Sequence, residues 1–288
     1  MMALPPTLLE ILQRSAEFLG KAGVENPRLE AEWLLAHVLG CKRLQLYLDF
    51  ERPMLPEVLD QLRPMVRRRA QREPLQYILG TTEFAGLELT VDRRALIPRP
   101  ETEALVDELM GEYGATPPPS VLDLGTGSGA IALALAAAWP GSSVTAVDRS
   151  PEALALAREN AARTGLDARV EWLGGSWFGP LAGRVFDLIV SNPPYLAEAE
   201  WKSAAPEVRG HEPHEALVAP GEGLADLESL LREAPRYLTT GGCLALETGI
   251  AQHEPLRAEA ESVGYARCES RLDHTGRPRY FRAWVEAR

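Results

Sequence analysis

Residues 121–136 read VLDLGTGSGAIALALA and give the clearest indication of the fold. An apolar run ends at Leu124, three alternating glycines follow, and an alanine-rich run begins at residue 130. Glycine lets the backbone turn tightly from a strand into a helix and approach a ligand closely. The pattern predicts a strand, a loop and a helix, with a nucleotide-like cofactor at the loop. The residues expected to contact it are Asp123, Gly125, Gly127 and Gly129.

Strand-like and helix-like segments alternate through the rest of the chain after residue 120. The segments SVTAVD, RVEWLGG, FDLIVSN and GGCLALETG are nearly continuous apolar runs. Such runs are typical of a parallel sheet that is covered on both faces. Two strand-like pieces around His274, Thr275 and Gly276 predict a final antiparallel hairpin. We therefore expect an α/β fold with a mostly parallel sheet.

The chain before residue 80 shows helical patterns and no strand pattern, which predicts a small helical bundle. Its segment RLEAEWLLAHVLG places Leu29, Trp33, Leu34 and Leu35 on one side of an expected helix. The alternation in FAGLELTVD then indicates a hairpin, and ATPPPS indicates a linker.

The identity of the cofactor is not decided by the glycine loop alone. Gly125, Gly127 and Ala130 also satisfy the loose dinucleotide pattern, and Asp148 ends the second strand as that pattern requires. Asp123 is placed to meet an ammonium group, which favours S-adenosylmethionine. Asp148 would then accept hydrogen bonds from the ribose hydroxyls, with a helix cap as its structural alternative.

The segment SNPPY, residues 191–195, follows the apolar run FDLIV. Two prolines end a sheet ladder, and that alone explains their presence. The Asn192 side chain and the Pro193 carbonyl can also accept two N–H bonds from a planar NH₂ group, while Tyr195 offers a ring for stacking. A neutral amide is no base, so catalysis would rest on positioning. We expect Asn192, Pro193 and Tyr195 to be catalytic, and Pro194 to join them in contacting substrate.

The overall charge limits the classes of partner. Thirty Lys and Arg against 41 Asp and Glu leave a net charge of -11, which argues against generic binding to nucleic-acid phosphate. The basic run Arg67, Arg68, Arg69 and Arg72 is most simply a solvated helix face. No apolar run reaches the length of a membrane span, and the first residues show no secretion signal, so we expect a cytoplasmic protein.

The sequence offers no metal site or disulfide framework. Cys41, Cys243 and Cys268 have spacings that fit neither. His211 and His214 are three residues apart with a proline between them, and no third ligand is evident. We expect no bound metal.

Together, DLGTGSGA, AVDRSPEAL and SNPPY resemble class I methyltransferases that act on planar NH₂ groups. That set includes DNA adenine and protein glutamine methyltransferases. The upstream YILGTTEFAGLELTVDRRALIPRPETE and the later EPHEALVA look like the bacterial peptide chain release factor glutamine methyltransferase family (HemK/PrmC). The resemblance spans nearly the whole chain.

The resemblance implies a Rossmann-like sheet of seven strands and three regions: 1–80 as a helical substrate-binding domain, 81–118 as hairpin, helix and linker, and 119–288 as the S-adenosylmethionine-dependent methyltransferase domain. It implies methyl transfer to the glutamine amide in the Gly-Gly-Gln motif of class 1 release factors, by a monomer that does not bind DNA. It implies cofactor contacts, with Trp177 beside the adenine, at Gly125, Thr126, Gly127, Ser128, Gly129, Asp148, Trp177 and Asn192. Arg99 and Glu101 would frame the substrate mouth, with a salt bridge at the helix start as an equal alternative.

Three other functions remain open at this point. A DNA adenine methyltransferase would present a flipped base to the same acceptors, although the chain lacks a basic recognition domain. A non-catalytic binding module could use the same fold, because fold does not determine function. A nicotinamide-dependent dehydrogenase is the most distant alternative.

Overall fold

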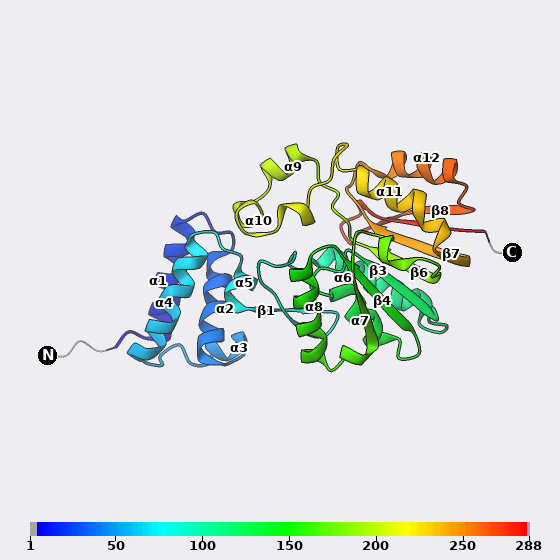
Figure 1. Ribbon diagram of the computed structural model, residues 1–288. Coiled ribbons are helices and arrows are strands. Elements are labelled where there is room, and N and C mark those ends of the chain that lie inside the picture. Colours follow the sequence, from blue (N-terminus) through cyan, green and yellow to red (C-terminus); the bar gives the residue numbers. More distant parts are fainter. Residues whose placement is uncertain (1–4, 287–288) are drawn as a thin grey trace. The chain divides into compact units, whose positions relative to one another are not determined.

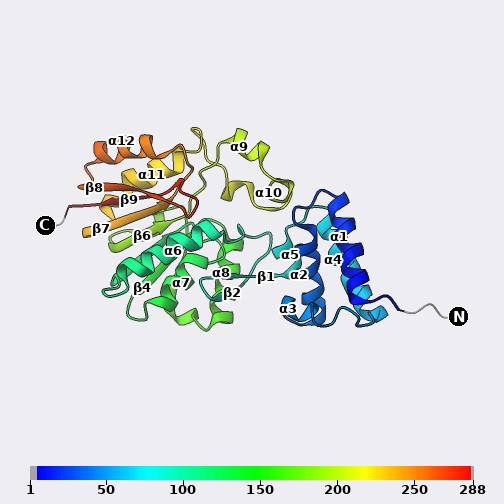
Figure 2. The same cartoon turned by 180° about the vertical axis from the view of Figure 1, so that it is seen from behind.

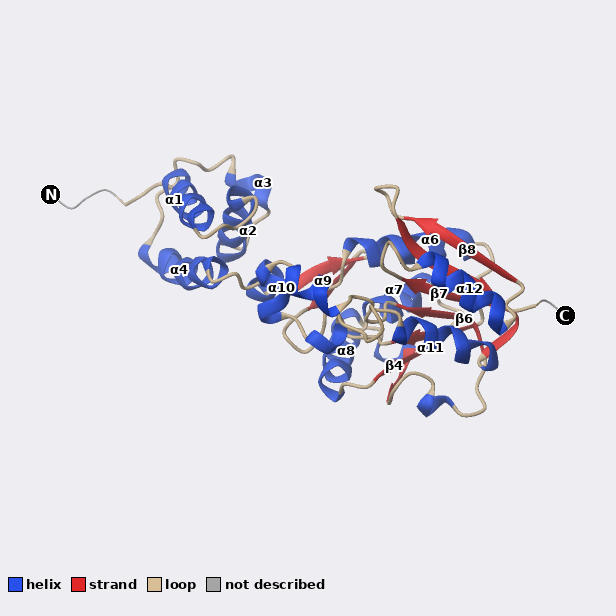
Figure 3. Cartoon of the chain, turned by 90° about the horizontal axis from the view of Figure 1, so that it is seen from above, coloured by secondary structure: helices blue, strands red, loops and turns tan. Residues whose placement is uncertain are grey.

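The computed structural model describes residues 5–286, and the chain forms two compact units (Figure 1). The first contains the chain up to Gly80 together with Ala205–His211. The second contains Thr81–Ala204 and the chain from Glu212 onward. Every strand of the described chain belongs to the second unit, and the first is built from helices and loops (Figure 3).

The first unit is a bundle whose helices enclose a separate apolar core. Thr7 caps its first helix with a capping box, because its side chain accepts from Glu10 N while Glu10 accepts from Thr7 N. Leu34 and Leu35 are buried, but Leu29 and Trp33 are 39% and 44% exposed. The helices are α1 (Leu8–Lys21), α2 (Pro27–Leu39), α3 (Arg43–Leu46), α4 (Pro56–Ala70), α5 (Leu75–Leu79) and α10 (Pro206–His211).

The prediction that four apolar residues of α2 share one side is therefore wrong for Leu29 and Trp33. Residues four apart lie on one helical face, whereas consecutive residues are about 100° apart. Leu29 and Trp33 form their own stripe, and Arg43 lies 5.3 Å from the centroid of the Trp33 ring. The helical unit thus carries an apolar stripe at its surface.

The short helix α10 joins the first unit through an ion network. Arg69 pairs with Glu30 of α2 and with Glu207 of α10, and Arg72 pairs with the same Glu207. The Arg69 side chain is only 5% exposed. Burial alone would raise the pKa of Glu207, but the hydrogen bonds from Arg72 and Arg69 lower that pKa to about 2. The expectation of a solvated basic face is wrong for Arg69 and Arg72, which are neutralised by carboxylates, whereas Arg67 and Arg68 are exposed as expected.

The second unit contains a seven-stranded sheet, and the predicted fold class is confirmed. Its strand order is β5-β4-β3-β6-β7-β9-β8. The neighbours from β5 to β7 are parallel, and β9 is antiparallel to both β7 and β8. The strands are β3 (Ser120–Leu124), β4 (Ser143–Asp148), β5 (Val170–Gly174), β6 (Phe186–Ser191), β7 (Leu238–Glu247), β8 (Arg267–Leu272) and β9 (Pro278–Trp284).

Helices cover both faces of this sheet, as the apolar strands predict. Alternate strand residues enter two different cores, one shared with α6, α7 and α8 and the other with α11 and α12. Figure 1 shows α11 and α12 in front of the sheet, and Figure 2 shows α6 and α7 from the opposite side. The helices of this unit are α6 (Pro100–Tyr113), α7 (Ala130–Ala138), α8 (Pro151–Thr164), α9 (Glu198–Ser203), α11 (Ala225–Glu233) and α12 (His253–Val263).

A separate two-stranded hairpin, β1 (Thr81–Phe84) and β2 (Leu87–Thr90), opens the second unit. Ala85 and Gly86 form its turn with φ of 48° and 75°, the left-handed pair that a two-residue hairpin requires. Asn160 of α8 holds the hairpin, since its Oδ1 accepts from Thr90 N and its Nδ2 donates to Thr90 O and Ser128 O. One buried side chain thus ties the hairpin to the glycine loop.

None of the helices in residues 5–286 combines the length and apolar character that crossing a bilayer requires. The three cysteines are free thiols.

Candidate active site

The glycine loop and the SNPPY segment lie beside each other because their strands are neighbours. Leu124, which ends β3, is in register with Ser191, which ends β6. The Ser191 hydroxyl donates to the Leu124 carbonyl over 2.6 Å. The chain order reverses between these two strands, and ligands of open α/β sheets bind at such a point outside the carboxyl ends.

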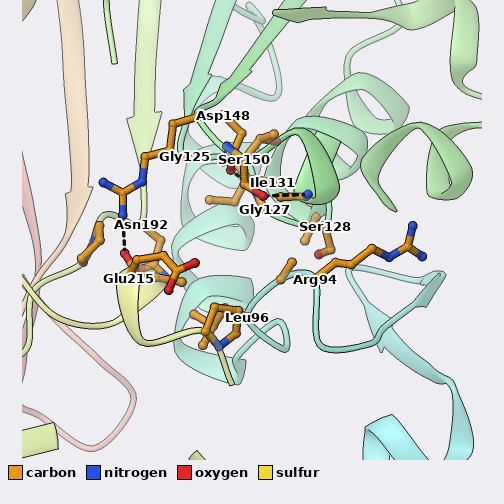
Figure 4. Close-up of a pocket in the computed structure, with 18 of the residues that line it drawn as sticks. Arg94, Leu96, Gly125, Gly127, Ser128, Ile131, Asp148, Ser150, Asn192 and Glu215 are labelled. Atoms are coloured by element: carbon orange, nitrogen blue, oxygen red, sulfur yellow. Dashed lines mark hydrogen bonds between the residues drawn. The ribbon is translucent and has the colours of Figure 1, made fainter. Parts of the chain in front are cut away.

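A cavity opens at this point and encloses about 1000 Å³, including open solvent at its mouth. Figure 4 shows Gly125, Gly127, Asp148 and Asn192 around it. The predicted site residues that line the cavity are Arg99, Gly125, Thr126, Gly127, Ser128, Asp148, Trp177, Asn192 and Pro194. The predicted residues outside the lining are Glu101, Asp123, Gly129, Pro193 and Tyr195.

The glycine loop has the conformation that its sequence predicts. Gly125, Gly127 and Gly129 have φ of 72°, 55° and 84°, where a side chain is strained. Asp148 braces the loop, since its Oδ2 accepts from Gly127 N and its Oδ1 from Ser150 N. Asp148 also faces the cavity, and each carboxylate oxygen retains a free lone pair for a ligand hydroxyl.

Asp123 lies beneath the loop rather than in the cavity wall. Its Oδ2 accepts from the Thr126 hydroxyl and from Ala132 N, and its buried Oδ1 has no partner among the described residues. Burial raises the pKa of Asp123 to about 7 against these hydrogen bonds. Its carboxylate therefore holds the loop in shape, and direct contact with a ligand ammonium group stays a prediction.

Trp177 forms another wall of the cavity. Its φ is 46°, a rare backbone conformation for a residue with a bulky side chain. Its ring contacts Gly125 so closely that a Cβ added there would lie 3.4 Å from Trp177 Cζ3. A flat ring beside a bare backbone is suited to a planar ligand group, in keeping with the predicted contact to adenine.

Asn192 presents its amide to the cavity with one end already engaged. Its Nδ2 donates to the Thr102 hydroxyl over 2.9 Å, and Thr102 donates to Glu247 Oε2 over 2.6 Å. Glu247, at the end of β7, is 1% exposed. Burial raises the pKa of Glu247, although the hydrogen bonds from Thr102 and Tyr195 oppose this effect.

Tyr195 turns its hydroxyl toward the same glutamate. The hydroxyl donates to Glu247 Oε1 over 3.0 Å and lies 3.4 Å from Arg279 Nη1. Burial raises the pKa of Tyr195 well above its usual range, so the phenol stays neutral. Tyr195 thus braces the segment behind the cavity wall, and stacking on a substrate stays a prediction.

Arg99 pairs with Glu212, the first residue of the EPHEALVA segment. Its guanidinium meets Glu212, whose side chain is 1% exposed and also accepts from Ile97 N. Arg99 is therefore not paired with Glu101, whose backbone carbonyl accepts from the Tyr280 hydroxyl. Within residues 5–286 there is no cluster of three His, Cys, Asp or Glu side chains suited to a metal ion.

Three polar residues that contact Asn192 or Tyr195 were not among the predicted site residues: Thr102, Glu247 and Arg279. Thr102 lies in the quoted segment IPRPETE, and Glu247 ends the apolar run CLALE. A carboxylate at the carboxyl end of the strand next to β6 was the available signal, because such ends meet at one edge of a parallel sheet.

The sheet order, the glycine loop after its first strand and the Asn-Pro-Pro-Tyr segment at the reversal point are the arrangement of the class I methyltransferases. A family model described as the PrmC N-terminal domain matches residues 10–80, and one described as the methyltransferase small domain matches residues 100–222. A solved methyltransferase from Pyrococcus furiosus shares the fold, with a TM-score of 0.52 and 20% identity over 70% of this chain and 90% of that chain.

Curated relatives are closer in sequence. A release factor glutamine methyltransferase of Geobacter sulfurreducens is 46% identical over 270 residues, which cover 94% of each chain. One from Deinococcus radiodurans is 45% identical and covers 96% of this chain and 98% of its own. The chain therefore belongs to the release factor glutamine methyltransferase family, and the resemblance found in the sequence is confirmed.

Proposed function

We propose that this protein transfers the methyl group of S-adenosylmethionine to the side-chain amide nitrogen of the glutamine in the Gly-Gly-Gln motif of class 1 release factors. The observation that carries the proposal is the Asn192 amide on the cavity wall, held by Thr102 through Nδ2 so that Oδ1 is left for a substrate. The names of the curated relatives support the substrate and do not favour the DNA adenine alternative.

The cavity fits S-adenosylmethionine in shape and in donor set. Gly125 and Gly127 leave bare backbone on one wall, and Trp177 lies against Gly125. Asp148 retains lone pairs for ribose hydroxyls. When bound, the cofactor supplies an electrophilic methyl group on a sulfonium.

The Asn-Pro-Pro-Tyr segment would position the substrate nitrogen. A carboxamide nitrogen is a weak nucleophile, so its orientation matters more than its basicity. Asn192 Oδ1 and the Pro193 carbonyl accept the two N–H bonds and hold the NH₂ group in one plane. Orientation of this kind lowers a barrier by up to about 7–11 kcal/mol. The amide proton leaves to water afterwards, because Asn192 is not a base.

The helical unit is the proposed docking region for the release factor. Apolar side chains are exposed on α2 and in the short segment that follows it: Leu29, Trp33, Leu44, Tyr47 and Leu48. Contiguous exposed apolar surface is a mark of protein interaction sites. We propose that this region binds the body of the release factor while the cavity receives the glutamine. The protein acts as a cytoplasmic monomer and does not bind DNA directly.

Methyl transfer from labelled S-adenosylmethionine to a class 1 release factor and to duplex DNA tests the proposal. We expect incorporation into the release factor alone, with one methyl group on the glutamine-containing tryptic peptide by mass. A release factor whose motif glutamine is replaced by alanine is the matched control and should take up none. Label in DNA alone would overturn the proposal.

A further inference from the structure

We propose that Thr102 and Glu247 are positioning residues that set the direction of the Asn192 amide. Neither residue belongs to the Asn-Pro-Pro-Tyr segment, and they come from two other elements, α6 and β7. Both are buried, at 5% and 1% exposure. The inference rests on the proposed function for its rate measurement, and on a second measurement that needs no substrate.

The hydrogen bonds of this cluster all run toward Glu247. An arginine only donates, and Arg279 Nη1 lies 3.4 Å from the Tyr195 oxygen. The Tyr195 proton is then directed to Glu247 Oε1, and the Thr102 proton to Glu247 Oε2. Each of the two Glu247 carboxyl oxygens thus accepts one of these protons. The cluster has one acceptor at its centre and donors around it.

This direction leaves Asn192 one orientation. Because the Thr102 proton is used on Glu247, the Thr102 oxygen presents only lone pairs to Asn192. A lone pair requires a donor, so Asn192 turns its NH₂ group inward and its Oδ1 outward. The reversed amide would set two oxygens against each other in a buried place. Glu247, which is two hydrogen bonds away from Asn192, thus determines which Asn192 atom faces the substrate N–H.

The substitution Glu247→Gln should reverse this direction without changing the shape of the side chain. The Tyr195 hydroxyl still accepts a hydrogen bond from Arg279 and needs an acceptor for its own proton, so the oxygen of the new amide faces Tyr195. The new NH₂ group then faces Thr102, whose proton turns to Asn192. We expect Asn192 to flip, and the kcat for a release factor to fall about 10- to 100-fold, as when an orienting partner is lost.

Two substitutions at Thr102 complete the test. Thr102→Val keeps the shape but removes the hydroxyl, and we expect a similar fall in kcat with KM within about threefold. Thr102→Ser restores the hydroxyl and should recover kcat to within about threefold. The matched control is Thr239→Val, because Thr239 also donates to a carboxylate, Asp187, at the opposite end of β7. It should leave kcat unchanged.

The measurement that needs no substrate is hydrogen exchange of the Asn192 side-chain NH₂ group, followed by NMR in the full chain. The signal is assigned by its loss in Asn192→Ala. It should be protected in the wild type and in Thr102→Ser, and exchange at least tenfold faster in Glu247→Gln. Unchanged exchange and unchanged kcat in Glu247→Gln and Thr102→Val would overturn the inference, as would Thr102→Ser being as impaired as Thr102→Val. If the Asn192 NH₂ group is protected but the protein does not methylate release factors, the proposed function is contradicted and the inference about Thr102 and Glu247 is not.

Discussion

Two glutamates, the half-buried Glu207 of the helical unit and the buried Glu247 of the second unit, are held in opposite ways. Glu207 of the helical unit is bound by the guanidinium groups of Arg69 and Arg72. Glu247 at the cavity is bound by the neutral hydroxyls of Thr102 and Tyr195. The pKa of Glu207 is lowered to about 2 and that of Glu247 is raised. The helical unit uses counter-charges to join segments, whereas the cavity uses directional donors to orient a side chain.

The two arrangements give opposite contributions to stability as pH changes. A lowered carboxyl pKa stabilises the folded state above the unfolded pKa, and this contribution is lost as pH falls toward 2. A raised carboxyl pKa acts in reverse, so stability is greatest at low pH and is lost as pH rises through the folded pKa. Asp123 and Glu247 belong to the second kind, and Glu207 belongs to the first.

The largest effect we expect comes from Asn192→Ala, which removes the oriented acceptor at the cavity. The kcat for a release factor should fall about 100- to 1000-fold, the size of loss seen when one oriented polar group is removed from an active site. Cofactor affinity, measured by calorimetry, should stay within about tenfold, and the melting temperature should be nearly unchanged. A kcat within threefold of wild type would contradict the role of Asn192 as an oriented acceptor, and with it the contrast between the cavity and the ion network of the helical unit.

Asp123→Asn should change how stability depends on pH. The wild-type carboxyl holds a proton between pH 4 and about 7 in the folded state only, so its contribution declines as pH rises across that window. Three pKa units correspond to on the order of 4 kcal/mol. Urea unfolding at several pH values should therefore show the variant gaining on the wild type from pH 4 to 7. A difference that is constant with pH would contradict a raised pKa.

The substitution Arg69→Met tests the ion network of the helical unit. Removing one partner of a buried ion network leaves a carboxylate short of its counter-charge, and we expect a loss of about 3 kcal/mol in the free energy of unfolding. Arg63→Met is the matched control on the same helix, since the pair with Asp60 is 60% and 69% exposed and should cost below about 1 kcal/mol. Equal losses would show that burial of the network has no consequence.

The smallest effect we expect is the difference between alanine substitutions at two glycines, one from each unit. It separates the cost of steric crowding from the cost of backbone strain. Gly129 and Gly80 have φ of 84° and 81°, so alanine at either position costs about 1–2 kcal/mol in strain. A Cβ at Gly129 would lie 3.1 Å from Trp172 and 3.2 Å from Ala157, whereas nothing lies within 4 Å at Gly80. Gly129→Ala should therefore lose about 1 kcal/mol more than Gly80→Ala in chemical unfolding. Equal losses in the free energy of unfolding would show that the structure around Gly129 shifts to accommodate the added Cβ without cost.

The features that could be predicted from the sequence are those set by residues adjacent in the chain. The strand, glycine loop and helix from Ser120 to Ala138 follow from residues that are adjacent in sequence. The role expected for Tyr195 was less accessible, because its hydroxyl is directed by Glu247 and Arg279, which are 52 and 84 residues away. The burial of α2 was misjudged at Trp33 for a related reason, since only packing decides which apolar stripe faces a core.

The fold class, the loop conformation and the family can be predicted from the amino-acid order, because glycine, proline and apolar periodicity act over a few neighbouring residues. The groups that orient Asn192 and the carboxylates that receive counter-charges become evident only once the chain is folded. Those contacts join the ends of different strands and helices, and the direction of a hydrogen bond depends on every donor that reaches the same acceptor.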